Sequence, residues 1–335
     1  MGNGNSITIR DVAASAGVSI STVSRYLNNP DSVKAYLGYN IRNAIRELNY
    51  QPNVSAQNLR KNTSNIIGVV TPSSEHFFGA CYKSISDYFY SKGYITYLCV
   101  SDNDIHKEQF FVRGLLSNRP AGLILVSCGK NKEFLSGISD GFRHIVVLDR
   151  MEDIDCDKVG SDHEANAYIL TNHILSNYSG YSPLVAILGF EQATSTQKIQ
   201  EGMYRSFAES AMLPDYEVFS GCNRFEALMI AIDHIRTQIK QGKNPRIIAF
   251  GPNLLERTVL ELIKTGISVR NGQVSIAGFV LPNTVDRLGF DFPCVIQNPE
   301  YSGIVAAEML YKRIAGETVT EQAQCYIIED KLNLI

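Results

Sequence analysis

The sequence lacks any long hydrophobic run, and its first residues do not resemble an export signal. No stretch of eighteen apolar residues occurs, whereas a helix needs about 20 of them to cross a bilayer. The start, from Met1 to Asn5, is polar and has neither the basic residues nor the apolar stretch of a secretion signal. These absences predict a protein without a membrane span that stays in the cytoplasm.

Cysteine pairs are also missing. The seven cysteines are odd in number, widely scattered and never arranged as C-x-x-C, which argues against a disulfide framework and against a zinc site. We therefore expect most of them to be buried thiols, and we expect no metal ion. They are Cys81, Cys99, Cys128, Cys156, Cys222, Cys294 and Cys325.

Known catalytic motifs are absent as well. The chain contains no Gly-x-Ser-x-Gly, no His-Glu-x-x-His and no glycine-rich phosphate loop. The six histidines are dispersed, and His163 and His173, ten residues apart on one predicted helix, are too distant to share a metal ion. The sequence therefore predicts that the protein is not an enzyme and uses no cofactor.

Charge is distributed unevenly along the chain. Residues 1–62 contain seven Lys or Arg against three acidic residues, a net charge of +4, and the remainder contains 24 basic and 31 acidic residues, a net charge of −7. A basic head on an acidic body is typical of nucleic-acid binding confined to the head. Because a basic segment is often merely solvated, this asymmetry only supports DNA binding.

Two short helices joined by a turn are predicted near the N-terminus. Thr8 and Asp11 have the spacing of a capping box ahead of an apolar run, which predicts a helix from Ile9. Gly17 ends this helix, and Ser19 can cap a second one. This is the composition of a helix-turn-helix, although two structural helices joined by glycine are also common.

The second helix, over 20–27, has an unusual outer face. Val23 and Leu27 recur at i and i+4 and can pack inward. The other positions carry small hydroxyl groups, one isoleucine and one arginine. Such a face suits a DNA major groove, because hydroxyls reach phosphates and arginine can form two hydrogen bonds to a guanine edge.

A third helix and a short linker complete this part. An apolar stripe at i, i+3, i+4 and i+7, formed by Ile41, Ala44, Ile45 and Leu48, predicts a helix that closes a small three-helix core. Pro52 ends it. The following residues, 54–59, are too few for a stable free helix, so without DNA we expect a flexible linker.

Residues 6–61, including the stretch 47–53, closely resemble the headpiece and hinge of the lac/purine repressor family. The resemblance implies a helix-turn-helix headpiece over 1–51 and a hinge over 52–63, which folds when two copies meet in the minor groove of a palindromic double-stranded DNA operator. We expect base-edge contacts from Ile20, Ser21 and Arg25, and phosphate contacts from Thr8, Ser19, Thr22, Ser24 and Asn28. The implied hinge contacts are Asn53, Ala56, Gln57, Leu59 and Arg60, with Leu59 wedged between base steps.

From Asn65 onward, apolar strands alternate with helices, which predicts an α/β fold with two doubly wound units of similar size. The predicted strands cover 66–70, 95–100, 121–126, 145–148, 159–161, 184–188, 247–250, 275–279, 294–296 and 324–328. The predicted helices cover 78–92, 105–117, 163–178, 198–211, 225–241, 254–264 and 301–314.

The resemblance continues more loosely through this part of the chain. It implies an effector-binding and dimerisation domain over 64–335, of the periplasmic-binding-protein-like type. Because the chain of the family crosses back, the first subdomain is expected to comprise about 64–161 and 292–321, and the second about 162–291 and 322–335. A cleft is expected between them, at the carboxyl ends of the strands.

Residues that follow predicted strands are expected to face this cleft. An aromatic pair beside a carboxylate and a guanidinium suits a sugar, because ring faces stack and charged groups bond hydroxyls. Arg150 and Lys198, on opposite subdomains, can also hold a phosphate, although each charge is equally consistent with a surface group or a strand-end ion pair. The candidate effector residues are Pro72, His76, Phe77, Phe78, Asp149, Arg150, Asp162, Lys198 and Gln297.

Three positions depart from the sugar-binding members of the family. Where these members carry arginine, aspartate and Asn-Asp, this chain has Ile199, Val280 and Gly251-Pro252. Either the effector differs, with a phosphorylated sugar favoured by the two basic residues, or the cleft has lost control by a small molecule.

The hypothesis that results is a homodimeric, sequence-specific transcriptional repressor, controlled by a sugar or sugar-phosphate effector in the cleft. The alternatives are a regulator whose body docks a protein partner and a bilobed solute-binding protein. The second alternative is disfavoured because a transport protein has no use for the headpiece.

Overall fold

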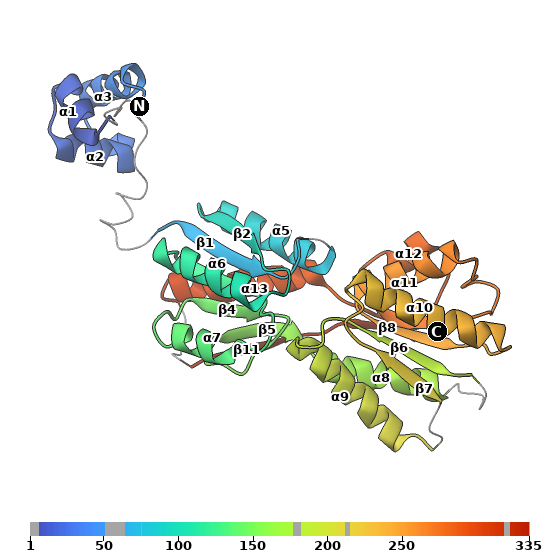
Figure 1. Ribbon diagram of the computed structural model, residues 1–335. Coiled ribbons are helices and arrows are strands. Elements are labelled where there is room, and N and C mark those ends of the chain that lie inside the picture. The colour runs from blue at the N-terminus through green and yellow to red at the C-terminus, as the bar shows by residue number, and fades with distance from the viewer. Residues whose placement is uncertain are drawn as a thin grey trace. The chain divides into compact units, whose positions relative to one another are not determined.

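The computed structural model describes residues 7–50, 64–74, 76–176, 182–211, 215–317 and 322–334 (Figure 1). The chain divides into two compact units, Met1–Ser64 and Asn65–Ile335, which are described separately below. The predicted hinge at 52–63 lies outside the described residues. Among the helices that are described, none combines the length and the apolar character that a membrane span requires.

The first unit is a small three-helix domain. Its helices are α1 (Ile9–Ala16), α2 (Ile20–Asn28) and α3 (Ala35–Glu47), with a 3-10 turn, η1 (Pro30–Ser32), after α2. The capping box forms as predicted, because the backbone N–H of Thr8 donates to Asp11 Oδ2 over 2.7 Å. Gly17 ends α1 with φ of +64°, a conformation that favours glycine. The core contains Val12, Ala13, Ala16, Val23, Tyr26, Ile41, Ala44 and Tyr50.

The second unit begins with a parallel six-stranded sheet in the order β11-β5-β4-β3-β1-β2. The strands are β1 (Ile66–Thr71), β2 (Ile95–Val100), β3 (Gly122–Leu125), β4 (Ile145–Leu148), β5 (Asp157–Ser161) and β11 (Cys325–Ile328). Its helices are α5 (His76–Ser91), α6 (Ile105–Ser117), α7 (Lys132–Ser139) and α13 (Pro299–Ile314). One apolar core lies under α5 and α13, and a separate core lies under α6 and α7 on the other face of the sheet.

The second six-stranded sheet has the order β12-β10-β9-β8-β6-β7, and β12 is antiparallel to β10. The strands are β6 (Leu184–Leu188), β7 (Tyr216–Phe219), β8 (Arg246–Phe250), β9 (Ser275–Val280), β10 (Cys294–Ile296) and β12 (Lys331–Asn333). The helices are α8 (His163–Ser176), α9 (Thr194–Glu209), α10 (Phe225–Lys240), α11 (Pro252–Lys264) and α12 (Thr284–Leu288). Two sheets that are parallel except for β12, each with helices on both faces, confirm the predicted fold class.

The chain passes between the two sheets in three described connections, from β5 to α8, from β10 to α13 and from β11 to β12. This corrects the expected boundaries. We expected 292–321 in the first subdomain, but β10 pairs with β9 of the second sheet. We expected 322–335 in the second, but β11 pairs with β5 of the first sheet. A short apolar strand carries no signal that identifies its neighbour, so the sequence does not reveal these assignments.

A buried ion pair holds the returning segments against the first sheet. Asp157 at the start of β5 is 3% exposed, and it accepts from Nε and Nη2 of Arg313 on α13 over 2.7 and 2.6 Å. The same carboxylate accepts the backbone N–H of Gln324, just before β11, over 2.8 Å. One side chain therefore joins β5, α13 and β11.

A second carboxylate lies in the last connection between the sheets. Asp330 accepts from Asn166 Nδ2 of α8 over 2.8 Å, whereas its Oδ1 is buried without a hydrogen-bond partner among the described residues. Burial raises the pKa of Asp330 to about 6, although a hydrogen bond from Ser161 and the nearby His163 partly oppose this rise. The ionised form of this carboxyl therefore lowers the free energy of unfolding.

We predict that Asp330→Asn stabilises the protein at pH 7.5 by about 1–2 kcal/mol. The folded-state pKa lies above the unfolded value, so the ionised carboxylate costs stability above about pH 6, and this cost disappears as the pH falls towards 4. Urea unfolding at pH 7.5, 6.0 and 4.5, at one protein concentration, should show an advantage of the variant that shrinks with decreasing pH. The exposed neighbour Glu329, changed to Gln, is the control. An advantage that is equal at all three pH values would contradict the prediction.

Candidate functional site

The second helix of the headpiece presents the face expected for DNA recognition. Val23 is fully buried and Tyr26 is 9% exposed, whereas Ile20 is 39% exposed and Ser21 and Arg25 are also exposed. Hydrophobic packing therefore fixes one side of α2 and leaves the predicted base-contacting side chains on the other. These three residues lie together, within a single turn and a half of helix.

A hydroxyl cluster marks the start of this helix. Ser19 caps α2 by accepting the backbone N–H of Thr22 over 3.2 Å. Its Oγ also lies 2.7 Å from Ser21 Oγ and 2.8 Å from Thr22 Oγ1. The predicted phosphate contact Thr8 donates its hydroxyl to Asp11 over 2.7 Å, so this hydroxyl already has a partner within the headpiece.

Of the remaining predicted DNA contacts, only Ser24 has a side chain that the structure describes. Ser24 is half-buried on α2. The side chain of Asn28 and the five hinge residues lie outside what the structure describes. The hinge residues are Asn53, Ala56, Gln57, Leu59 and Arg60.

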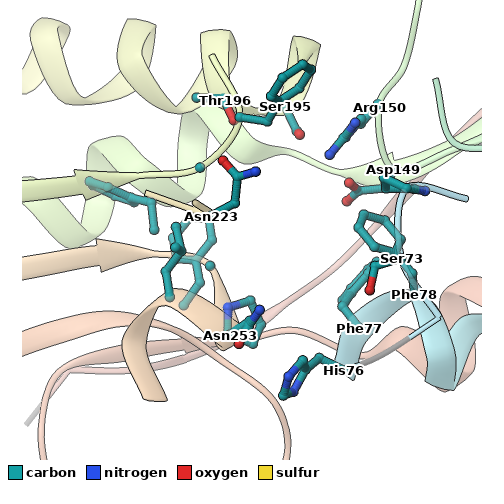
Figure 2. A pocket seen from close by; sticks show the side chains of 18 of the residues that line it. Ser73, His76, Phe77, Phe78, Asp149, Arg150, Ser195, Thr196, Asn223 and Asn253 are labelled. Atoms are coloured by element: carbon teal, nitrogen blue, oxygen red, sulfur yellow. The ribbon is translucent and has the colours of Figure 1, made fainter. Parts of the chain in front are cut away.

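In the second unit, a cavity of about 200 Å³ lies at the carboxyl ends of strands from both sheets. Figure 2 shows Asp149, Arg150 and Phe78 on one side, facing Ser195, Thr196 and Asn223 on the other. The predicted residues that line it are Pro72, His76, Phe77, Phe78, Asp149, Arg150 and Gln297. Seven of the nine predicted effector residues are thus brought together.

Aromatic rings form much of the cavity wall. Phe77 and Phe78 at the start of α5 pack edge to face with centroids 5.4 Å apart, and Phe250 and Phe279 do the same across β8 and β9 at 5.5 Å. Phe190, two residues after β6, also lines the cavity. Ring faces and edges of this kind suit the apolar face of a flat or cyclic ligand.

Arg150 contributes a guanidinium to this aromatic wall. Its side chain is 6% exposed, and Nη1 donates to Asn103 Oδ1 over 2.7 Å and to the Ser127 carbonyl over 2.9 Å. The guanidinium lies 5.7 Å from the ring centre of Phe78 and 5.9 Å from that of Phe190, and its Nε has no hydrogen-bond partner among the described residues. Burial lowers its pKa more than nearby carboxylates raise it, but an arginine remains charged.

Asp149 and His163 form a buried ion pair between the two halves of the second unit, each half being one sheet with its helices. Asp149 follows β4 with φ of +64°, and its Oδ1 accepts from Nε2 of His163, at the start of α8, over 3.0 Å. Burial raises the pKa of Asp149, but His163 and Arg150 have the larger opposite effect, so the pKa lies below its ordinary value. Burial lowers the pKa of His163, but Asp149 raises it above its ordinary value. Each group therefore favours the charged form of the other.

Two predicted effector residues, Asp162 and Lys198, line a neighbouring cavity of about 440 Å³ instead. The amino group of Lys198 is paired with Glu201 and, over 3.4 Å, with Glu164 of α8. The structure therefore places Arg150 and Lys198, which we expected to hold one phosphate together, in the linings of different cavities. The cause is the start of α9 at Thr194, four residues earlier than predicted, which places Lys198 one turn inside the helix.

Several lining residues were not among the predicted site residues. They include three amides and one ring: Asn103, Asn223, Asn253 and Phe190. Asn223 follows β7, a short half-exposed strand that the sequence pattern does not reveal. Of the three positions that were expected to depart from sugar-binding members, Ile199 and Gly251-Pro252 line the cavity and Val280 does not.

Metal binding has no support in the described ranges, because no three His, Cys, Asp or Glu side chains within them come together as ligands. The cavity therefore offers hydrogen bonds, aromatic surfaces and one guanidinium. This combination can bind a small molecule.

Comparison with known proteins agrees with this geometry. Residues 8–53 match the family model described as bacterial regulatory proteins, lacI family. The chain is 27% identical over 316 residues to the HTH-type transcriptional repressor PurR of Aliivibrio salmonicida, covering 92% of each chain. It is 28% identical over 313 residues to PurR of Vibrio campbellii, again covering 92% of each.

Solved structures share the fold over almost the whole length. A LacI-family transcriptional regulator from Silicibacter pomeroyi superimposes with a TM-score of 0.78 at 23% identity, covering 98% of each chain. The lac repressor dimer bound to operator and the anti-inducer ONPF gives a TM-score of 0.78 at 20% identity, covering 97% of each. With the headpiece match and the full-length relatives, these likenesses confirm the resemblance seen in the sequence. Residues 8–53 carry the DNA-binding domain of the lacI family of bacterial regulatory proteins, the rest of the chain resembles that family, and the protein is a DNA-binding transcriptional regulator.

Proposed function

We propose that this regulator is a homodimeric repressor whose affinity for a palindromic operator changes when a small sugar or sugar phosphate binds in the first cavity. The observation that carries the proposal is the buried guanidinium of Arg150, enclosed by aromatic rings from both halves of the second unit. The protein would act beside the chromosome, in the bacterial cytoplasm. The proposal includes no catalysis, cofactor or membrane.

DNA specificity is assigned to the outer face of α2. Arg25 can form two hydrogen bonds with a guanine, and Ile20 can contact a thymine methyl group. The hydroxyl groups at the start of the helix, together with the hinge, fix the position of the protein on the backbone. Two headpieces in a dimer then recognise two half-sites, which is why the operator is expected to be palindromic.

The effector would be bound by both halves of the cavity. The amides of Asn223 and Asn253 can bond hydroxyl groups, and the rings of Phe77 and Phe78 can cover an apolar ring face. Arg150 can hold an anionic group, since its own hydrogen bonds go to neutral oxygens. Among the structural relatives, CelR is known as a complex with cellobiose, at a TM-score of 0.63.

Control of DNA binding would follow from linkage between the two sites. An effector that contacts both halves favours one angle between them, and this angle sets the distance between the two hinges of a dimer. The affinity for the operator then changes by the same factor as the affinity for the effector. Whether the effector releases or strengthens DNA binding depends on which angle suits the operator.

Homodimerisation is supported by an exposed apolar belt on the second unit. The edge strand β2 exposes Ile95 (51%) and Tyr97 (49%), and α11, which packs against α5 and α10, exposes Leu260 (53%) and Ile263 (55%). Exposed apolar side chains of this size are common at protein–protein interfaces. We propose that a second copy of the chain covers this belt.

We predict that Arg25→Ala weakens operator binding by about 1–3 kcal/mol and relaxes the preference at one base pair per half-site. The operator can be obtained by selection from random duplexes, and affinities measured by fluorescence anisotropy at one salt concentration. Arg10→Ala, which removes an exposed cation from α1, is the charge-matched control and should leave the sequence preference unchanged. Equal losses on operator and random DNA would refute the role of Arg25.

We predict that a sugar phosphate raises the melting temperature of the full-length protein in a thermal-shift screen against free and phosphorylated sugars. Arg150→Met should weaken binding of that phosphosugar at least tenfold, because the charge-assisted bonds to the anion are lost. Binding of a free sugar should change much less. Operator binding without a shift by any compound would instead favour control by a protein partner.

We predict that Tyr97→Asp combined with Leu260→Asp separates the dimer, because each places a charge in the apolar belt. Light scattering after size exclusion should give twice the chain mass of 37.2 kDa for the unchanged protein and the single mass for the variant. Phe110→Asp is the matched control, since this ring is 73% exposed on α6 and does not belong to the proposed interface. Dimers in both variants would place the interface elsewhere.

A further inference from the structure

A carboxylate outside the cavity is completely buried. Glu108 on α6 is 0% exposed, and its two oxygens accept from the backbone N–H of Cys128 over 2.6 Å and from Asn131 Nδ2 over 2.8 Å. Gln109 in turn donates to Asn131 Oδ1 over 2.9 Å. Burying a carboxylate is costly unless it gains such bonds. The bonds to Cys128 and Asn131 tie Glu108 to the loop that follows β3.

That loop, residues 127–131 after β3, holds the guanidinium of the cavity. The carbonyl of Ser127 accepts from Arg150 Nη1 over 2.9 Å, and the hydroxyl of Ser127 accepts the backbone N–H of Gly129 over 3.0 Å. The negative charge of Glu108 also acts on Arg150 directly and favours its charged form. Glu108 therefore fixes the loop at the residues on either side of Gly129, while the loop fixes Arg150.

The same loop touches the opposite half of the unit. Gly129 has φ of +79°, and a Cβ atom there would lie 2.0 Å from the carbonyl oxygen of Gln192, in the segment between β6 and α9. Phe190, in the same segment, lies over the guanidinium of Arg150. The two backbones are thus as close as glycine allows, beside the charged group of the cavity.

We infer that Glu108 is a positioning residue for effector binding: its buried charge holds the 127–131 loop so that Arg150 faces the cavity and Gly129 meets Gln192. This inference rests on the proposed function, because it takes Arg150 as the group that binds the effector's anion. Glu108 does not line the cavity and touches no effector. It acts through the loop and through its charge.

The charge can be moved without losing a hydrogen bond. In Glu108→Gln, the amides of Asn131 and Gln109 can rotate to keep their bonds, so that chiefly the charge is lost. Adding Asn131→Asp returns one buried negative charge at the neighbouring side chain, where the new amide on α6 and the amide of Gln109 can both donate to it. Glu133→Gln, an exposed charge at the start of α7, is the matched control.

The test measures how fast p-hydroxyphenylglyoxal modifies Arg150 in the full-length protein, read by peptide mass spectrometry. We expect Glu108→Gln to raise the rate at least fivefold, the double variant to return it to within twofold of the original, and the control to leave it unchanged. Calorimetric titration with glucose 6-phosphate is the second readout. The affinity of the protein for this ligand should fall at least fivefold in Glu108→Gln and recover in the double variant.

An unchanged modification rate in Glu108→Gln, or a rate that stays high in the double variant, would overturn the inference. The first result would show that the carboxylate does not act on Arg150, and the second that packing rather than charge is responsible. If the unchanged protein fails to bind glucose 6-phosphate, the proposed effector class loses its support. The modification rates still decide the role of Glu108, so the two failures are distinguishable.

Discussion

The chain passes between its two sheets in three described connections, and this constraint determines where the functional side chains of the second unit lie. Because the strands of each sheet that carry the site are parallel, their carboxyl ends meet at the connections, and the residues that follow them converge on one cavity. The bonds of Asp157 to Arg313 and to the backbone of Gln324 hold the returning segments on the first sheet. These bonds act together with the apolar packing of α13 and the pairing of β11 with β5.

Electrostatics in this region leaves one charge directed at the cavity. Asp149 is matched by His163 from the opposite half, and Lys198 is matched by carboxylates on its own side. Arg150, by contrast, is held by an amide oxygen and a carbonyl oxygen, which orient the guanidinium without neutralising it. The cavity therefore presents one guanidinium among mostly apolar walls, and an anionic group on a ring-shaped molecule fits both properties.

Local patterns predicted the parts of the site that depend on local chemistry. The cap at Ser19, the exposed face of α2 and the strand-end pair of Asp149 and Arg150 follow from short-range rules. Lys198 was misplaced because α9 starts four residues earlier than predicted, so that Lys198 lies inside the helix and not at its start. Glu108 gave no signal, since an acidic residue on an amphipathic helix is ordinarily solvated and its burial depends on partners twenty residues away.

The contact between Gly129 and Gln192 also sets a mechanical limit. Two backbones already at the separation that glycine permits cannot move closer, so any motion that brought the two halves together would end at this contact. Molecules that fit within the cavity at this end point leave the geometry unchanged, whereas bulkier ones must hold the halves apart by their excess size. Ligand size would then be converted into an angle, and one scaffold could give full, partial or reversed responses to a series of related molecules.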